Sequence, residues 1–438
     1  MEYGSPILYK RVEIPPEFCV MGEEGTYGGD IRMGDLVGKG RADFLVYRSV
    51  DDAHDGGGMK PCFLGAFTAD GEVLWQVGEG GVQPSRPGPV AIYDIDGDGR
   101  DEVICFFLDP AVEADPDSMA NVVVQIRDGA NGDLVKQDSP AELRSCRGRG
   151  ATWVHQRIMI ANFRGTDTPR DFVIKLGGKV IAFDEDLQVL WTYESRWTEY
   201  SRCPAYIPSV GDIDGDGRDE VNGGYFLLDH DGTVLWEKQL GWNMDSVSIA
   251  EWDNGQVRAI CSGFGHVMDG CGNVVLRLGE EKVPHGQEVR VARFCADDPS
   301  PQMVIRYQGH NTDVMVVDTK GICLNDFRLN PSPNNTGMEV VYWNGPDAPA
   351  LLYNGGMLWL PLEGVSIPLP GLPDPRPVGR MAWYHCIPAD VCGDEREEVV
   401  LYNPWETAVY IYTPYPLDES LYRGYRSSAR QYNVRLMD

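Results

Sequence analysis

The sequence predicts an all-β fold, a β-propeller with eight blades, or with seven if one repeat is an insertion. Three observations lead to this prediction: an acidic loop that occurs twice, a recurring strand–turn–strand hairpin, and a repeat interval close to the length of a four-stranded blade. The 438 residues include 51 glycines and 30 prolines spread along the chain, as expected for many short strands joined by turns. We therefore expect a single propeller domain over residues 1–438.

The hairpin is the clearest repeated unit. It joins two alternating apolar strands through a turn of the Asp-x-Gly kind, in which glycine accepts the positive φ of a tight turn. Two examples are FLGAFTADGEVLWQV, residues 63–77, and YFLLDHDGTVLWE, residues 225–237. The first strand of each unit is marked by the residue at its end, which gives Asp35, Asp94, Asn162, Asp212, Trp252, Phe294, Trp343 and Asp390. These marks are 40 to 68 residues apart, and a blade needs about 40–50. The segment ILYKRVEI near the N-terminus is expected to supply a strand that closes the ring.

The acidic loops predict two structural calcium sites. The same nine residues, DIDGDGRDE, occupy positions 94–102 and 212–220. Carboxylates at loop positions 1, 3, 5 and 9, with the carbonyl of position 7, form an oxygen-only ligand set that suits Ca²⁺. The expected ligands are Asp94, Asp96, Asp98, Arg100 and Glu102 in the first loop, and Asp212, Asp214, Asp216, Arg218 and Glu220 in the second. The alternative is a solvated acidic turn.

Two further loops are divergent copies of this motif. In the loop 390–398, Cys392 replaces a carboxylate, and in the loop 35–43, Lys39 stands where a ligand would be. We expect Lys39 to act as an internal cation in place of a metal. All of these loops connect inner strands on one face, so the prediction is that they stabilise blades and do not catalyse.

Candidate catalytic residues map to the opposite face. In a four-stranded blade, the segments before the first strand and after the second strand converge around the mouth of the central channel. His155, His285 and His385 precede a first strand, and His266 and His310 follow a second strand. Imidazoles gathered on one rim could act as acid and base, or could hold a second metal directly.

Polar and aromatic residues occupy the same positions in other blades. Arg86 and Asn335 belong to segments before first strands, Lys175 and Tyr225 follow second strands, and Tyr384 adds an aromatic ring. Such groups suit a sugar, because rings stack on its apolar faces and polar groups bind its hydroxyls. Arg86 or Lys175 would neutralise a uronate carboxylate during β-elimination. The rim is richer in histidine than in carboxylates, which favours elimination over hydrolysis by a carboxylate pair.

The overall charge and the composition of the chain limit the expected binding partners and the expected location of the protein. The net charge of −29 disfavours nucleic acid and membrane surfaces as partners. No signal segment or apolar run of 18 residues is seen, and the eleven cysteines form no CxxC pair, so we expect a cytoplasmic protein. The tail 418–438 carries four arginines among tyrosines. It is expected to pack on an acidic surface, the alternative being a contact with a substrate carboxylate.

Several segments resemble a known group of proteins. The acidic loops, with VPHGQEVRVARF, QGHN, SPNNTGMEVVYWNG, WYHCIPADVCGDEREEVVLYNP and the tail GYRSSARQYNVRLMD, look like bacterial propeller proteins related to rhamnogalacturonan lyases. Those lyases are eight-bladed, calcium-containing propellers that cleave rhamnose–galacturonate backbones by elimination. The resemblance implies a uronate-directed lyase with His285, His310 and His385 as the matching rim histidines.

The sequence therefore leads to a hypothesis and two alternatives. The hypothesis is a lyase that cleaves an acidic plant-type or bacterial glycan, containing rhamnose and uronate, by β-elimination. The first alternative is a glycoside hydrolase on the same scaffold that releases rhamnose or a related sugar. The second is a propeller that binds glycan without cleaving it.

Overall fold

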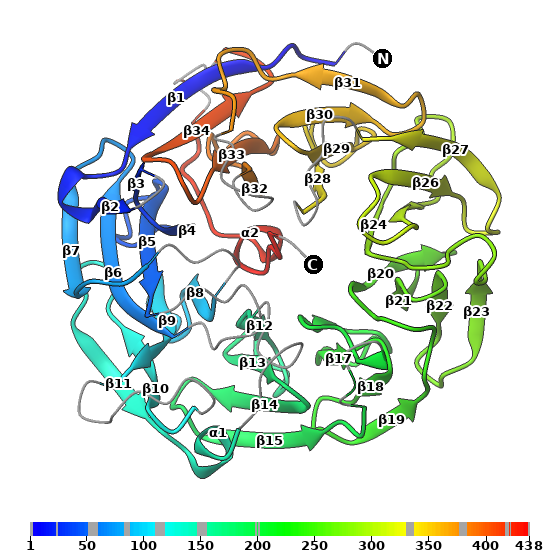
Figure 1. Ribbon diagram of the computed structural model, residues 1–438, viewed down its shortest axis with the longest axis horizontal. Helices are drawn as coiled ribbons and strands as arrows, with labels where there is room; N and C mark the ends of the chain where they lie inside the picture. The colour runs from blue at the N-terminus through cyan, green and yellow to red at the C-terminus, as the bar shows by residue number, and fades with distance from the viewer. Residues whose placement is uncertain are drawn as a thin grey trace.

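The computed structural model describes residues 3–22, 25–50, 60–82, 88–109, 119–146, 156–197, 199, 202–329, 337–375, 383–416, 420 and 422–436. Three residues of the predicted site, Arg86, His155 and Asn335, lie outside these ranges. The described residues form eight four-stranded antiparallel sheets arranged as the blades of a ring (Figure 1), together with one two-stranded sheet. The prediction of an eight-bladed all-β propeller is therefore confirmed.

The first four blades follow the chain in order, each running from its inner to its outer strand. Blade 1 contains β4 (Asp30–Gly34), β5 (Asp43–Ser49), β6 (Pro61–Thr68) and β7 (Val73–Gly78). Blade 2 contains β8 (Val90–Tyr93), β9 (Glu102–Leu108), β10 (Val122–Arg127) and β11 (Leu134–Asp138). Blade 3 contains β12 (Met159–Ala161), β13 (Asp171–Leu176), β14 (Lys179–Asp184) and β15 (Val189–Glu194). Blade 4 contains β16 (Ser209–Gly211), β17 (Glu220–Asn222), β18 (Phe226–Leu228) and β19 (Val234–Glu237).

The remaining blades repeat this pattern until the ring closes. Blade 5 contains β20 (Val247–Asp253), β21 (Gln256–Cys261), β22 (His266–Met268) and β23 (Val274–Arg277). Blade 6 contains β24 (Glu288–Ala292), β25 (Gln302–Arg306), β26 (Asp313–Val317) and β27 (Cys323–Arg328). Blade 7 contains β28 (Glu339–Val341), β29 (Leu351–Asn354), β30 (Met357–Leu360) and β31 (Val365–Pro368). Blade 8 contains β32 (His385–Ala389), β33 (Glu398–Tyr402), β34 (Ala408–Thr413) and β1 (Ile7–Glu13).

Strand β1 closes the ring by joining the two ends of the chain in one blade. It pairs antiparallel with β34, in a register that places Ile7 opposite Thr413 and Glu13 opposite Ala408. Short elements complete the described fold: the hairpin β2 (Val20–Gly22) with β3 (Gly25–Tyr27), the 3-10 turn η1 (Pro16–Phe18), and the helices α1 (Ala141–Arg144) and α2 (Ala429–Tyr432). Among the described helices, none has the length and apolar character needed to span a bilayer.

The hydrophobic core lies between neighbouring blades. The second and third strands of a blade are covered on both faces, which explains why β13 (DFVIKL) and β10 (VVVQIR) are buried along their whole length. Outer strands such as β11 (LVKQD) are largely exposed. The rings of Phe106 in blade 2 and Phe183 in blade 3 meet edge to face, with centroids 6.4 Å apart. Each blade therefore depends on its neighbours to bury its apolar faces.

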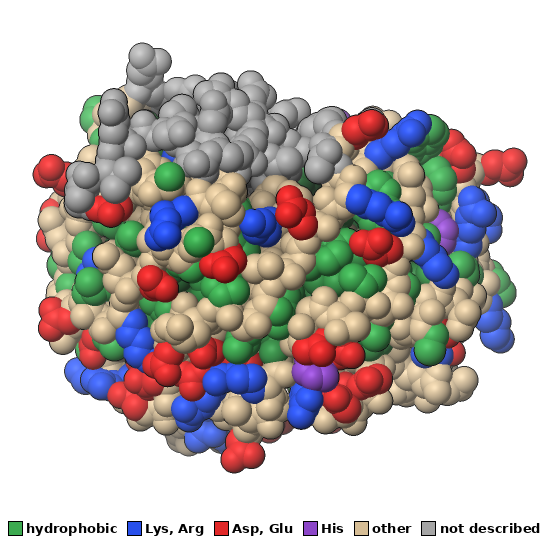
Figure 2. Space-filling model, turned by 90° about the horizontal axis from the view of Figure 1, so that it is seen from below, with side chains coloured by type: hydrophobic (Ala, Val, Ile, Leu, Met, Phe, Trp, Pro, Cys, Tyr) green, Lys and Arg blue, Asp and Glu red, His purple; other side chains and the backbone are tan. Residues whose placement is uncertain are grey.

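The eight residues that mark the repeat in the sequence all lie within two residues of the end of an inner strand. In a meander of this kind, the turns after the inner strands all lie on one face of the ring. We call it the acidic-loop face, since the loops 94–102 and 212–220 belong to it. In the side view of Figure 2, Asp and Glu side chains gather along the lower edge of the ring. The opposite face, where inner strands begin, is called the rim face.

The C-terminal tail enters the central channel. Helix α2 lies at the centre of the ring in Figure 1 and contacts the inner strands of blades 1, 2, 3 and 8. The Arg430 guanidinium pairs with Glu397 at 2.5 Å. Asn433 exchanges two hydrogen bonds of 2.8 Å with the backbone of Ile160. The described part of the tail thus ties blades together from inside the ring.

Candidate functional site

The two intact acidic loops place carboxylates where the calcium prediction needs them. Oxygens of Asp94, Asp96 and Glu102 lie within 4.8 Å of one another, as do those of Asp212, Asp214 and Glu220. The first aspartate also fixes the turn, because the Asp94 carboxylate accepts hydrogen bonds from the amides of Gly97 and Gly99, at 2.8 and 3.0 Å. These contacts hold three carboxylates around a common point in each loop.

The glutamates at position 9 are the buried members of these clusters. Burial and the neighbouring aspartates raise the pKa of Glu102 and of Glu220 to about 8. One carboxylate oxygen of Glu220 is buried without a hydrogen-bond partner, while the other accepts the Ile213 amide at 2.7 Å. An oxygen left in this way suits a hard cation, which would relieve both the repulsion and the missing contact.

The remaining predicted ligands are placed differently. The Asp98 carboxylate pairs with the Arg100 guanidinium at 2.8 Å and caps the Arg100 amide at 2.9 Å. Asp216 likewise accepts the Arg218 amide at 2.8 Å. The described loops therefore gather three of the four predicted carboxylates, and position 5 forms local contacts instead.

On the rim face, a histidine–aspartate pair connects blades 5 and 6. Asp245 lies just before β20 and His285 just before β24, and the His285 Nε2 is 2.8 Å from an Asp245 carboxylate oxygen. The aspartate side chain is 4% exposed and the histidine side chain 36%. The hydrogen bond to Asp245 raises the pKa of His285, against the opposing effect of burial. Nε2–H donates to the carboxylate, so the lone pair of the neutral imidazole is on Nδ1.

The loop after β25 passes close to this nitrogen, and a glycine there avoids a clash with it. A Cβ built on Gly309 would lie 2.8 Å from Nδ1 of His285, and Gly309 has a positive φ of 58°. His310 follows directly, and its ring centroid is 6.2 Å from that of His285. His310 is exposed. Two of the predicted histidines are therefore neighbours at the surface of the rim face.

Lys175, at the end of β13 in blade 3, is a buried cation of the rim face. It is buried, and burial lowers its pKa to about 8, while the Cys203 thiol favours the charged form. Cys203 precedes β16, and burial raises the pKa of its thiol, with a further contribution from the charge of Asp245. Within the part of the chain that the structure describes, the Lys175 ammonium forms no ion pair. A buried ammonium of this kind suits an anionic ligand.

Aromatic residues flank the same arc. Tyr225 is buried, and its hydroxyl donates to the backbone oxygens of Gly241, at 3.1 Å, and of Trp242. The Trp242 ring is 45% exposed and receives the Arg202 guanidinium at 4.9 Å from its centroid. Tyr225 thus holds an exposed indole in place, which can stack on a sugar ring.

His385 lies elsewhere, in the central channel. It is 4% exposed, its Nδ1 is 3.2 Å from the Leu436 carbonyl oxygen of the tail, and its ring packs against Tyr402 at 5.3 Å between centroids. Burial lowers its pKa. Tyr402 donates to Asp30, which also pairs with Arg32 at 3.2 Å. The structure therefore places His385 in a buried polar network of blades 8 and 1, away from His285 and His310 in blade 6.

The other predicted ligand-binding residues are also buried. His266 is 5% exposed, and its Nδ1 is 2.6 Å from the Gly263 carbonyl oxygen. Tyr384 packs edge to face on Tyr410, with centroids 5.7 Å apart. His266 and Tyr384 therefore lie in the interior of their blades.

Sequence reasoning did not select Asp245 or Cys203. Both lie in segments that lead into an inner strand, the position from which the histidines were chosen. The rule applied to histidine would have found Asp245 if it had been extended to carboxylates. Its pairing with His285 brings together residues 40 positions apart, and only the packing of blade 5 against blade 6 creates it.

Comparison with known proteins agrees with this architecture. YesW of Bacillus subtilis, a rhamnogalacturonan endolyase, is 24% identical over 460 residues, covering 92% of this chain and 70% of YesW. The rhamnogalacturonan exolyase YesX of the same organism is 25% identical over 270 residues, covering 53% of this chain and 44% of YesX. The chain is a relative of the rhamnogalacturonan lyases.

Solved structures of these relatives share the propeller. The YesW structure superposes with a TM-score of 0.72 at 19% identity, covering 98% of this chain and 80% of YesW. The rhamnogalacturonan lyase PL11 of Bacillus licheniformis gives a TM-score of 0.73 at 19% identity, covering 99% of this chain and 81% of that protein. No family model matches the chain. The relationship to the rhamnogalacturonan lyases thus comes from whole-chain similarity, and the structural likeness supports the fold.

Proposed function

We propose that this protein is a polysaccharide lyase that cleaves a rhamnose- and uronate-containing glycan by β-elimination on its rim face. The similarity to YesW and YesX supports the substrate class. The observation that carries the proposal is a His–Asp pair on the rim together with a buried ammonium, Lys175, that has no carboxylate partner among the described residues. Cys203 lies within electrostatic range of both Lys175 and Asp245. Elimination next to a uronate carboxylate needs both a base and a cation.

In the proposed reaction, Nδ1 of His285 takes the proton from C5 of the uronate. The C4–O bond then breaks, a C4–C5 double bond forms, and no water is consumed. Lys175 binds the carboxylate, which makes the C5 proton more acidic, and His310 gives a proton to the leaving oxygen. Asp245 holds His285 in the tautomer that leaves Nδ1 free, so it is a positioning residue.

We further propose that the loops 94–102 and 212–220 each hold one Ca²⁺. Asp94, Asp96 and Glu102 would bind it in the first loop, and the second loop offers the equivalent set. A bound cation would neutralise the clustered carboxylates and fix the turn between two strands. The loops lie on the face opposite to the proposed reaction, so their role would be structural.

Product analysis separates the proposal from its alternative. Elimination leaves an unsaturated uronate that absorbs in the ultraviolet, whereas a hydrolase yields saturated sugars at both ends. The test is incubation of the protein with rhamnogalacturonan oligosaccharides, followed by ultraviolet absorbance and mass analysis of the products. Cleavage without the unsaturated product would identify a hydrolase. Binding without any cleavage would identify a glycan-binding propeller.

A further inference from the structure

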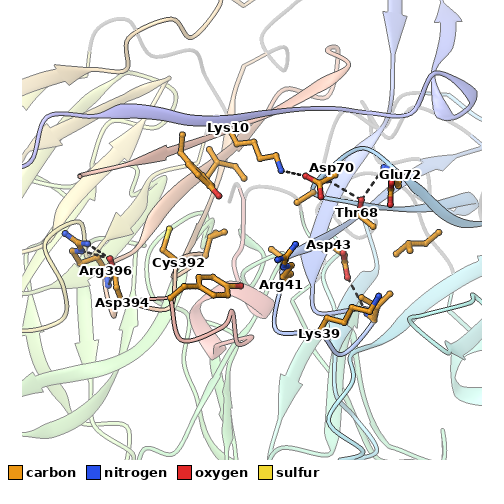
Figure 3. A pocket seen from close by; sticks show the side chains of 18 of the residues that line it. Lys10, Lys39, Arg41, Asp43, Thr68, Asp70, Glu72, Cys392, Asp394 and Arg396 are labelled. Atoms are coloured by element: carbon orange, nitrogen blue, oxygen red, sulfur yellow. Dashed lines mark hydrogen bonds and ion pairs between the residues drawn. The ribbon is translucent and has the colours of Figure 1, made fainter. Parts of the chain in front are cut away.

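A cavity of about 690 Å³ lies on the acidic-loop face, where blades 8 and 1 meet, and the proposed reaction does not use it (Figure 3). Its walls come from β1, from the Thr68–Glu72 turn of blade 1, from the tail residue Tyr422, and from the loops 35–43 and 390–398. The last two are the divergent copies of the acidic motif. Both divergent loops therefore line the same cavity, at the seam of the ring.

The divergent loop of blade 1 keeps the backbone of an intact loop. The Asp35 carboxylate accepts the amides of Lys39 and Gly40, at 2.9 and 2.7 Å, as the first aspartate of an intact loop does. Its glycines also have positive φ, 64° at Gly38 and 66° at Gly40. Two ligand positions have lost their carboxylates, with Val37 at position 3 and Lys39 at position 5, and Ala42 replaces the aspartate at position 8.

Because of these changes, the divergent loops lack the clustered carboxylates that would bind a metal cation, and the loop of blade 1 carries a positive charge instead. Among the described residues, neither divergent loop brings three carboxylates together, whereas both intact loops do. In blade 8, Cys392 occupies position 3, and Asp394 at position 5 pairs with Arg396. A loop that keeps its turn and the arginine at position 7, Arg41, but places Lys39 where a ligand would be, favours an anion over a divalent cation.

Four cations line the cavity, and two of them form no ion pair with a described residue. Lys10 pairs with Asp70 at 2.5 Å, and Arg396 is taken by Asp394. Lys39 and Arg41 are exposed and form no ion pair in the described part of the chain. In Figure 3, Arg41 lies between Cys392 and Asp43, and no interaction is drawn from its guanidinium.

Two carboxylates remain to balance these cations. Asp43 is 3% exposed, accepts the Val37 amide at 3.3 Å, and has its pKa raised to about 6 by burial. Glu72 is exposed and also lines the cavity. Neither forms an ion pair with Lys39 or Arg41 in the described part of the chain. Lys39 lies within electrostatic range of Asp43, and Arg41 within that of Asp70, but both cations stay exposed to a ligand.

The edge of the cavity carries aromatic rings. Tyr9 of β1 is 45% exposed and Tyr422 of the tail 42% exposed. The Tyr422 hydroxyl donates to the Gly40 carbonyl oxygen, which fixes the ring next to the cationic loop. Leu74 and Ile411 add apolar wall, and the volume is within the usual range for small-ligand sites. Cations with flanking tyrosines form a combination that suits a sugar acid.

We propose that this cavity is a second binding site, for a short uronate-bearing oligosaccharide, in which Lys39 and Arg41 hold the carboxylate and Tyr9 and Tyr422 pack against the sugar. The choice of a sugar as the ligand rests on the proposed function. The inference that the cavity binds an anion rests only on the positions of Lys39 and Arg41. The site would let the enzyme hold an acidic glycan at a distance from its reactive rim.

Calorimetric titration with trigalacturonate, which lacks the rhamnose–uronate linkage, tests the proposal. The double variant Lys39→Ala/Arg41→Ala is expected to bind at least tenfold more weakly in the cavity, with its melting temperature and its cleavage of short substrates unchanged. Arg423→Ala, which removes one exposed arginine outside the cavity lining, is a control for the loss of surface charge and should bind normally. The uncharged methyl ester of the same trisaccharide should not bind.

The rim variant Lys175→Met separates this proposal from the proposed function. Cavity binding should survive in that variant, and would survive even if the protein cleaved nothing. Absence of trigalacturonate binding in the unmodified protein, or binding lost only in the rim variant, would overturn the second site. Displacement of the sugar by inorganic phosphate as readily as by galacturonate would overturn the sugar assignment, because it would identify a general anion site.

Discussion

The two faces of the ring are built in different ways. On the acidic-loop face, each candidate metal site comes from nine consecutive residues, and its three gathered carboxylates belong to one turn. On the rim face, Lys175 comes from strand β13 of blade 3, and Cys203, Asp245 and His285 come from the connections that lead into blades 4, 5 and 6. A local site can be repeated or lost blade by blade, whereas an assembled site exists only in the closed ring. We therefore expect the first face to control stability and the second to control turnover.

Replacement of His285 should give the largest effect on turnover. His285→Gln keeps a donor for the Asp245 carboxylate but removes the base, so kcat should fall by about 10²–10⁴-fold. The measurement is the initial rate of ultraviolet-absorbing product from rhamnogalacturonan oligosaccharides. The melting temperature should stay close to that of the unmodified protein, because Asp245 keeps a partner. If the variant lost both stability and activity, the expectation that the rim face controls turnover and not stability would be wrong.

Replacement of Lys175 should give the second-largest loss of activity. Lys175→Met retains the volume of the side chain but removes the cation, and kcat/KM on uronate substrates should fall by about 10²–10³-fold. Stability should not fall, since burial already opposes the charge of this lysine and lowers its pKa to about 8. Paired kinetic and thermal-melting measurements on the same preparation test both statements. A clear drop in melting temperature with normal kinetics would show that Lys175 supports the fold only.

Calcium should change the stability of the protein and leave its rate of turnover unchanged. At about a hundredfold excess over its dissociation constant, Ca²⁺ bound to one loop should add about 2.7 kcal/mol to the free energy of unfolding. Asp94→Asn and Asp212→Asn should each remove part of this gain in chemical denaturation, and Lys39→Ala in a divergent loop should not. The rate at low temperature should be the same with calcium or with a chelator. A chelator that abolishes turnover in the folded protein would place a metal at the rim instead.

The smallest expected effect is a shift in the pH profile. The Asp245 carboxylate raises the pKa of His285, and a base works only when unprotonated, so kcat/KM should fall as the pH drops through that raised pKa. In Asp245→Asn, the His285 pKa should be lower, and the acidic limb of the profile should move to lower pH. Measurement of kcat/KM across the acidic and neutral range tests this. An unchanged or oppositely shifted limb would show that Asp245 does not set the protonation of His285.

Much of the architecture could be read from the residues because it follows local rules. Each of the eight marks used to find the blades lies within two residues of the end of an inner strand, since glycine-rich turns and alternating apolar strands are short-range features. The candidate site could be predicted only to the level of a face. His285 and His310 are neighbours there, but His385, chosen by the same rule, is buried against the tail carbonyl of Leu436. Strand order indicates the end of a blade at which a residue lies. It does not indicate whether that residue faces solvent or the channel.

What the sequence determined by itself is the set of local objects: the blades, their turns, and the nine-residue loops whose carboxylates must lie close together wherever the loop is placed. What only the tertiary structure decided is which distant groups meet. Closure of the ring pairs Asp245 with His285, buries Lys175 without an ion pair to any described residue, and brings the two divergent loops to one cavity at the seam. The physical reason is that the turn chemistry acts over a few residues, whereas these encounters depend on how eight blades pack around a common axis.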